Sequence, residues 1–473
     1  MSQSSSPEVA EVPGSSASAP RVGLRQWVDD RFPFSSLWSA HLTEYYAPKN
    51  LNFWYYFGSL AIFVLAIQIV SGIFLAMHYK PDSALAFGSV ELIMRDVDWG
   101  WLIRYIHSTG ASAFFIIIYM HIFRGFLYGS YRRPRELVWI VGCLIFLALM
   151  AEAFFGYLLP WGQMSFWGAQ VIVNLFSAIP GIGPDLALWI RGDYVVGDAT
   201  LNRFYAFHII AIPLLLVAIV GAHIIALHQV GSNNPDGIEI KANKDERGNP
   251  RDGITFHPYY TVHDLFGVSV FLMVFCAVLF FAPTFGGYFL EHNNFMPADP
   301  LKTPPHIAPV WYFTPFYSML RATTSTSVHL WMGVLGAAAL RAAWRARRRP
   351  LRAALVAAGA AWLMWALATL DAKFWGVVVM GGAVLSLFAL PWLDRSAVKS
   401  MRYRPRWHLA LLLGFVCAFV MLGWFGISPP SPMGYWISVS CTFVYFGFLW
   451  LMPWWSRLGR CRAVPERLVY RPH

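Results

Sequence analysis

Charged residues are scarce in this sequence: Asp, Glu, Lys and Arg make up 13% of its 473 residues. A soluble globular protein carries nearer 25%. Hydrophobic residues reach 57%, and the mean hydropathy is +0.49. This composition excludes an ordinary soluble domain and predicts an integral membrane protein. The net charge of +11 would suggest nucleic acid in a soluble chain. Here the positive residues gather in short loops, as the positive-inside rule expects, so no nucleic-acid partner is predicted.

Cysteine is also scarce, and a secretion signal is lacking. The five cysteines form no C-x-x-C or C-x-x-C-H motif, which argues against a covalently attached haem, a zinc knuckle and a disulfide framework. The first 20 residues are rich in Ser, Ala, Pro and Glu and have no apolar core, so they are not a cleaved signal peptide. We expect residues 1–30 to be a disordered cytoplasmic tail.

What the sequence does contain is long apolar runs. They predict ten membrane-spanning helices, at 53–77, 101–125, 137–158, 204–228, 264–283, 327–344, 352–370, 374–393, 407–427 and 434–454. The arginine-rich loops 124–135, 341–352 and 395–406 and the tail after 457 all fall on one side. With an N-terminus in the cytoplasm, that side is cytoplasmic. We therefore predict an all-α, polytopic membrane protein with both termini in the cytoplasm.

Four histidines stand at helical spacing in two of these runs. His107 and His121 are 14 residues apart in the second run, and His208 and His223 are 15 apart in the fourth. Each pair lies near one helix face and spans roughly 21–23 Å, most of a hydrocarbon core. Ionisable groups in a membrane are costly and usually functional. Because both helices run in the same direction, the pattern predicts two bis-histidine centres. They are His107 with His208 at the outer depth and His121 with His223 at the inner depth.

Neighbouring helices repeat this period with glycine. Missing side chains would let a flat macrocycle approach the backbone, whereas ordinary small-residue packing is the alternative interpretation. Arg104 and Arg124 flank the first histidine pair, where a guanidinium could bind a haem propionate through two hydrogen bonds. The glycines are Gly58 and Gly72 in the first run and Gly142 and Gly156 in the third.

Four long motifs stand out in and between the predicted spans. They are Gly156-Tyr-Leu-Leu-Pro-Trp-Gly-Gln-Met-Ser165, His228-Gln-Val-Gly-Ser-Asn-Asn-Pro-Asp-Gly237, Phe256-His-Pro-Tyr-Tyr260 and Pro304-Pro-His-Ile-Ala-Pro-Val-Trp-Tyr312. These motifs resemble cytochrome b of the ubiquinol–cytochrome c reductase family, of a bacterial type. The resemblance covers about residues 30–321 and resumes at 374–454.

This resemblance implies an N-terminal four-helix bundle with two b haems, an outer one of low potential and an inner one of high potential. It implies a quinone cycle in the bacterial inner membrane. Quinol is oxidised at an outer, periplasmic site, and electrons cross through both haems to reduce quinone at an inner site. The implied partners are a Rieske iron–sulfur protein, a cytochrome c1-type subunit, ubiquinone, membrane lipid and a second copy of the complex.

The resemblance also implies the residues of the outer quinol site. They are Tyr157, Gly168, Pro309, Trp311, Tyr312 and Tyr317. Many relatives carry Glu where this chain has Val310, and valine cannot accept the proton that quinol oxidation releases. Our hypothesis is that Glu291, together with His292, provides the proton path instead.

The inner quinone site, by the same resemblance, contains His228 and Asp264, with Ser232 and Asn233 nearby. A histidine and a carboxylate can each hydrogen-bond a quinone carbonyl and deliver a proton. His263 stands where relatives often carry Lys, so we assign it no role.

The predicted organisation has six parts. Residues 322–371 have no counterpart in the familiar pattern; we expect a helical hairpin whose arginine-rich turn faces the cytoplasm, packed against another subunit or anionic lipid. The parts are the tail 1–30, the di-haem bundle 31–240, the fifth helix and outer-site loop 241–321, the hairpin 322–371, three helices at 372–455 and a basic tail at 456–473.

Two other functions remain open at this point. A di-haem anchor subunit of a dehydrogenase or hydrogenase would share the paired histidines but lack both quinone-site motifs. A secondary transporter would show internal repeats and broken helices, and no repeat between the halves is visible.

Overall fold

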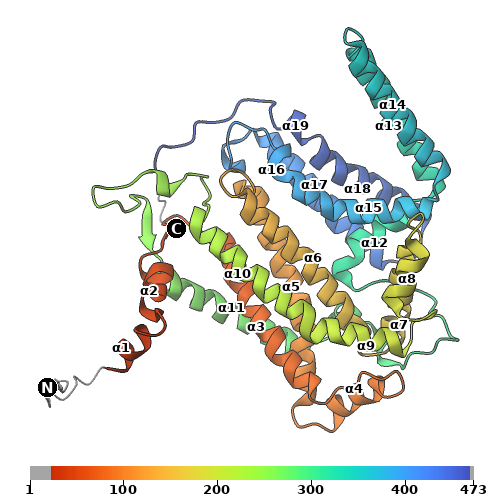
Figure 1. The fold of residues 1–473 in the computed structure, drawn as a ribbon, viewed down its shortest axis with the longest axis horizontal. Coiled ribbons are helices and arrows are strands. Elements are labelled where there is room, and N and C mark those ends of the chain that lie inside the picture. The colour runs from red at the N-terminus through yellow and green to blue at the C-terminus, as the bar shows by residue number, and fades with distance from the viewer. Residues whose placement is uncertain (1–22, 469–473) are drawn as a thin grey trace, which may run out of the picture.

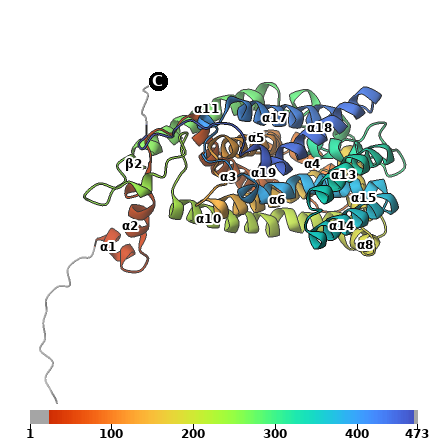
Figure 2. The ribbon, with the colours of Figure 1, turned by 90° about the horizontal axis from the view of Figure 1, so that it is seen from above.

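The computed structural model describes residues 23–468 as a helical bundle (Figures 1 and 2). The α-helices are α1 (Leu24–Asp29), α2 (Phe34–Trp38), α3 (Tyr56–Ala76), α4 (Ala86–Arg95), α5 (Gly100–Tyr128), α6 (Glu136–Leu158), α7 (Gln163–Phe176), α8 (Gly183–Arg191), α9 (Asp198–Ala206), α10 (Ile212–Val230), α11 (Tyr259–Phe281), α12 (Thr314–Arg321), α13 (Ser325–Arg345), α14 (Pro350–Thr369), α15 (Ala372–Leu385), α16 (Leu390–Leu393), α17 (Arg406–Ile427), α18 (Pro432–Trp450) and α19 (Met452–Trp455). Two short strands, β1 (Tyr46–Pro48) and β2 (Gly253–Thr255), pair antiparallel.

All ten predicted spans are helical. Within residues 23–468, nine helices are long and apolar enough to cross a membrane. Helix α13 is the one predicted span that is not among them. Helix α13 forms where it was predicted, but its first turn is polar, Ser-Thr-Ser, and Arg341 interrupts its apolar run. The prediction that residues 1–30 are disordered is wrong for the last part of this segment, because Leu24–Asp29 forms a helix. Residues 1–22 lie outside the described part.

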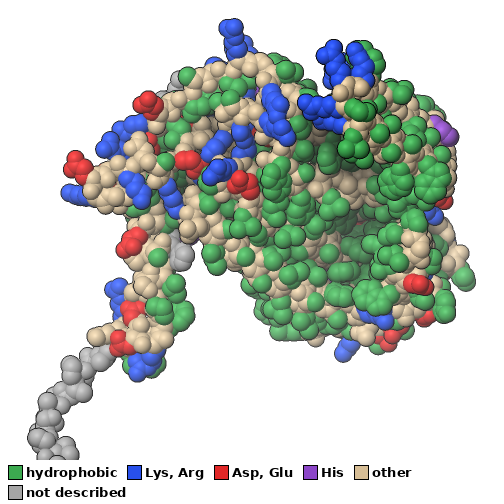
Figure 3. Space-filling model, turned by 45° about the horizontal axis from the view of Figure 1, so that its top comes forward, with side chains coloured by type: hydrophobic (Ala, Val, Ile, Leu, Met, Phe, Trp, Pro, Cys, Tyr) green, Lys and Arg blue, Asp and Glu red, His purple; other side chains and the backbone are tan. Residues whose placement is uncertain are grey.

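Helices α3, α5, α6 and α10 form one side of the bundle, with α11 against α3 and α5. Helices α12, α15, α17 and α18 form the other side. A cluster of buried aromatic side chains joins the two sides: Phe115, Phe126, Phe146, Phe415 and Tyr445. Large apolar side chains also cover much of the surface, among them Leu214, Phe266 and Phe281. Such an extensive exposed apolar surface fits contact with lipid (Figure 3).

The loops at one end of the bundle, which we call the basic end, are residues 129–135, 231–258 and 394–405. Buried ion pairs hold them together. Arg404 Nη2 lies 2.5 Å from Asp394 Oδ2, both side chains are 0% exposed, and the Tyr131 hydroxyl donates to the same carboxylate. Burial alone would raise the pKa of Asp394, but the Arg404 guanidinium holds it below its usual value. This end therefore depends on a fully buried charge pair.

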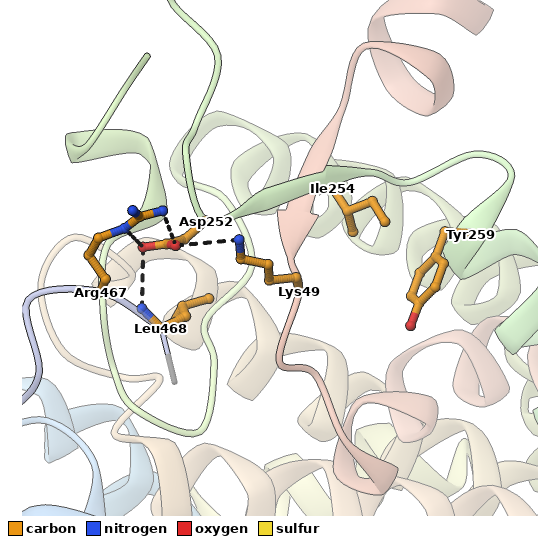
Figure 4. A pocket seen from close by; sticks show the side chains of 6 residues that line it. All are labelled: Lys49, Asp252, Ile254, Tyr259, Arg467 and Leu468. Carbon is orange, nitrogen blue, oxygen red and sulfur yellow. Dashed lines mark hydrogen bonds and ion pairs between the residues drawn. The ribbon is translucent and has the colours of Figure 1, made fainter. Parts of the chain in front are cut away.

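The C-terminal tail returns across the basic end to the two-stranded sheet (Figure 1). Asp252, next to β2, binds Arg467 at 3.0 Å and Lys49 at 3.6 Å, and accepts from the backbone N–H of Leu468 (Figure 4). These contacts border an open pocket of about 550 Å³ that also touches Ile254 and Tyr259. None of the predicted site residues lines it, and Arg467 and Leu468 of the C-terminal tail form part of its wall.

Helices α13 and α14 form a hairpin that projects from the bundle (Figure 1). It is attached at its base, where the Thr324 hydroxyl bonds that of Tyr435 and Leu367 is buried. Farther along, Leu340 is 74% exposed and Trp344 65% exposed. The predicted hairpin is thus present as a peripheral element.

Candidate haem and quinone sites

The outer layer of the bundle brings His107 and His208 together. Their ring centres lie 6.0 Å apart, with ring planes perpendicular. A transition metal bonded to imidazole nitrogens at about 2 Å each would hold two ring centres roughly 6 Å apart. This spacing fits one metal ion between the two rings. The predicted outer pair is therefore brought together by the fold.

The extra residue between His208 and His223 is accommodated by the helix itself. Residues Phe207–Ala211 form a π-helical turn between α9 and α10, and such a turn holds one more residue than an α-helical turn. Pro213 follows and has no N–H to donate to the preceding turn, which favours the wider turn. The backbone of this helix therefore absorbs the one-residue difference between the two histidine spacings.

The inner layer pairs His121 with His223. Both are mostly buried, and they interact electrostatically. Their Nδ1 atoms are buried and have no hydrogen-bond partner in the described part of the chain. Residues 23–468 contain no cluster of three or more His, Cys, Asp or Glu that could hold a metal ion. Pairs of imidazoles thus suit an iron whose other ligands come from a macrocycle.

The four predicted glycines face these imidazoles. A Cβ placed at each glycine would lie close to Cε1 of one histidine, at 2.3 Å for Gly156 and His208 and at 3.3 Å for Gly142 and His223. The corresponding distances are 3.2 Å for Gly72 and His107 and 3.4 Å for Gly58 and His121. Each glycine thus makes room first for a histidine ring, and room for the macrocycle stays a prediction.

The outer histidines have partners for their second ring nitrogen. Ser71 Oγ lies 3.0 Å from Nδ1 of His107 and donates its own proton to the Ile67 carbonyl at 2.7 Å. Ser71 must therefore accept from Nδ1–H, which leaves Nε2 free for a metal. Nδ1 of His208 lies 3.0 Å from the Glu152 carbonyl oxygen and 3.0 Å from its carboxylate. Such partners orient a ligand histidine and strengthen it as a donor.

The two predicted propionate ligands lie at opposite ends of α5. Nη2 of Arg124 donates weakly to the Asn233 carbonyl at 3.5 Å, while its Nε is buried and has no hydrogen-bond partner within residues 23–468. Arg104 borders a small pocket with Pro160 and Leu290, and it has no ion pair with any described residue. Both guanidiniums thus retain donors for an anionic ligand.

Two of the predicted outer quinol-site residues, Tyr157 and Tyr312, lie near Glu291. The Tyr157 side chain faces Glu291, and Gly168 lies against the Tyr157 ring. The Tyr157 hydroxyl and Oε2 of Glu291 are buried, and neither has a hydrogen-bond partner in residues 23–468. Burial raises the pKa of Glu291 to about 7, with a smaller opposing effect from Tyr157. A buried acid of that pKa suits proton transfer near neutral pH.

The Pro-Val-Trp-Tyr segment is fixed beside α5. The Trp311 indole N–H donates to Ser112 Oγ at 3.0 Å, and the Tyr312 ring stacks on Phe115 with centres 3.9 Å apart. Tyr312 also interacts electrostatically with Glu291. Val310 is buried and supplies no polar group. The Tyr317 hydroxyl donates to the Ile307 carbonyl, away from these groups, at a long 3.4 Å.

Two residues predicted for the inner quinone site, His228 and Asp264, lie beside aromatic side chains. The His228 ring stacks on Tyr45, with centres 4.3 Å apart, and the Tyr45 hydroxyl bonds Ser232. Asp264 accepts from Ser59 Oγ at 2.8 Å. Tyr55 lies against Asp264 and packs with Tyr45 in one buried cluster. His228 and Asp264 therefore border the same cluster.

Asn233 does not join this group, because its amide is buried and donates to the Tyr128 carbonyl and to Ser130. Sequence reasoning missed several polar partners found by the structure. They are Tyr45, Ser59, Ser71 and Glu152. Only Glu152 carried a signal, as an acid in an otherwise apolar run.

The chain is similar to known proteins along nearly its whole length. The family model described as cytochrome b/b6/petB matches residues 42–231, and the model described as cytochrome b(C-terminal)/b6/petD matches residues 297–446. Cytochrome b of Allochromatium vinosum is 56% identical over 461 residues, which cover 96% of this chain and 100% of that protein. Cytochrome b of Rhodobacter capsulatus is 42% identical, with 95% of each chain covered.

A solved structure is also similar to this chain. A chain described as hyperthermophilic respiratory Complex III superposes with a TM-score of 0.74 and 36% identity, covering 90% of this chain and 97% of that one. The fold defines a multi-pass membrane protein with nine helices in residues 23–468 that are long and apolar enough to cross a membrane. The chain belongs to the cytochrome b family, and haem b is the prosthetic group that this family implies.

Proposed function

We propose that this chain is the di-haem cytochrome b subunit of a quinol:cytochrome c oxidoreductase. The observation that carries the proposal is the pair of histidine layers, stacked along one four-helix bundle. His107 and His208 would hold the outer haem, and His121 and His223 the inner one. Bound haem supplies one-electron carriers at two depths of the membrane.

The protein's own residues supply proton chemistry at both ends. At the outer site Glu291 accepts a proton from a quinol hydroxyl, and Tyr157 hydrogen-bonds the quinol. His292 is exposed next to Glu291 and can pass the proton to water. At the inner site, His228 and Asp264 hydrogen-bond the quinone carbonyls and deliver protons during reduction. Each quinol oxidised releases two protons outside and gives up two electrons, of which one passes to the iron–sulfur partner and one would cross the membrane when haem is bound. Two quinols oxidised therefore supply the two electrons that, with two protons from inside, reduce one quinone.

The outer haem is the one of lower potential in this proposal. Ser71 and Glu152 both accept from the outer histidines, and the inner histidines lack such partners among the described residues. An accepting partner makes imidazole a stronger donor, which favours the oxidised metal. With haem bound in both layers, this difference in potential would favour electron transfer from the outer to the inner layer.

Partners and orientation complete the proposal. Because one electron of each quinol must leave at the outer site, the subunit works with a Rieske iron–sulfur protein and a cytochrome c1-type subunit, in a homodimer of the whole complex. The basic end faces the cytoplasm of a bacterial inner membrane, consistent with the positive-inside rule. The hairpin α13–α14 lies at the periphery, against lipid or another subunit.

Replacing single ligand histidines tests the haem assignment. Membranes with His208→Leu should lose the outer b-haem absorbance and keep the inner one, and His223→Leu should do the reverse. His329→Leu, an exposed histidine on α13, is the matched control and should keep both. Two intact haem signals in either ligand variant would overturn the assignment.

A further inference from the structure

An acidic side chain stands inside the bundle beside the outer layer. Glu152 lies on α6, one turn before Gly156. Its Oε1 is 3.0 Å from Nδ1 of His208, and both side chains are 16% exposed. Its Oε2 is buried and has no hydrogen-bond partner among residues 23–468. Placing a carboxyl group within a membrane span costs free energy, and such groups are usually functional. A carboxyl group in contact with a proposed ligand histidine therefore suggests a role at that histidine.

The inner layer shows what the carboxyl group adds. The glycines of α6 repeat after 14 residues, so Val138 occupies, relative to Gly142, the position that Glu152 occupies relative to Gly156. The backbone of Val138 faces His223, just as the Glu152 carbonyl faces His208. Both layers thus place a backbone oxygen near the ligand histidine, and among the described residues only the outer one forms a hydrogen bond with the ring. The outer layer alone adds a carboxylate.

We propose that Glu152 is a positioning residue that holds His208 with Nε2 toward the outer haem and lowers the reduction potential of that haem. The inference rests on the proposed function, in which His208 is an outer-haem ligand. Nδ1–H donates to the Glu152 carbonyl, which fixes the tautomer of the ring, and the carboxylate lies 3.0 Å from the same nitrogen. Its negative charge, in a region of low dielectric, favours the more positive, oxidised iron.

The test is a redox titration of both b haems, followed by absorbance, in the purified complex. Glu152→Gln keeps the size and an acceptor oxygen but removes the charge. We expect the outer haem to become easier to reduce by at least tenfold in its reduction equilibrium, about 59 mV for one electron. The inner haem should not shift. Glu152→Asp, which keeps the charge, should shift the outer haem less than Glu152→Gln does.

Glu136→Gln is the matched control, because it removes an acid from the first turn of the same helix and should move neither potential. The low-spin ferric signal of the outer haem in electron paramagnetic resonance is a second readout, since it follows the orientation of the ligand rings. An unchanged outer potential in both Glu152→Gln and Glu152→Ala would refute the inference. Absence of two b-haem signals in the unaltered complex would instead refute the proposed function.

Discussion

Many relatives carry Glu at the position of Val310, so the proposed function needs another group to accept the proton from quinol. Replacing Glu291 tests directly whether Glu291 is that group. Burial raises the pKa of Glu291 from 4.5 to about 7. That rise corresponds to about 3 kcal/mol against the charged form. A general base typically contributes 10²–10⁴-fold to a rate. We therefore expect Glu291→Gln to slow quinol oxidation about 100-fold at pH 8.

The sign of the pH dependence follows from the raised pKa. The group must be ionised to accept a proton, and with a pKa of about 7 about nine tenths of it is ionised at pH 8 and about one tenth at pH 6. The ratio of unaltered to Glu291→Gln rate should therefore fall about tenfold from pH 8 to pH 6. Taking the ratio removes pH effects of the quinol and of the partner subunits, which both enzymes share.

The assay is steady-state reduction of cytochrome c by quinol in purified complex, with reduction of the b haems followed in single turnovers. Glu91→Gln is the matched control, because Glu91 is a solvent-accessible acid in α4, paired with Arg95. Glu291→Gln combined with Val310→Glu should recover part of the rate, since it places an acid at the position where many relatives carry Glu. Equal rates for Glu291→Gln and the unaltered complex from pH 6 to pH 8 would refute the reasoning.

Two further predictions concern packing. Gly156→Ala should abolish binding of the outer haem, because its Cβ would lie 2.3 Å from the His208 ring, whereas Gly142→Ala, whose Cβ would lie 3.3 Å from the His223 ring, should keep the inner haem. The measurement is haem absorbance per mole of protein, and equal loss in both variants would contradict the distances between these glycines and the histidine rings. Arg404→Met should destabilise the protein by about 3–5 kcal/mol, because it leaves the Asp394 charge buried without its partner. Adding Asp394→Leu should restore much of the loss; thermal unfolding measures both, and a double variant no more stable than Arg404→Met would count against the buried pair.

Much of the site is predictable from local sequence because membrane helices obey strong local rules. Apolar length fixed where the spans lie, and a spacing of 14 residues placed His107 and His121 on one face of α5. The same period located Gly142 and Gly156 opposite the histidines of α10. The absence of an acid at Val310 was also readable directly, and it pointed to Glu291.

The tertiary structure alone decided how distant segments meet, because those contacts depend on packing rather than on local pattern. It placed Glu291 against Tyr157 across more than 130 residues and put the carboxylate of Glu152 on His208. It also showed a π-helical turn before Pro213 absorbing the extra residue between the histidines. A span's hydropathy records that it lies in the membrane, but only the packed bundle determines which neighbour each polar side chain finds.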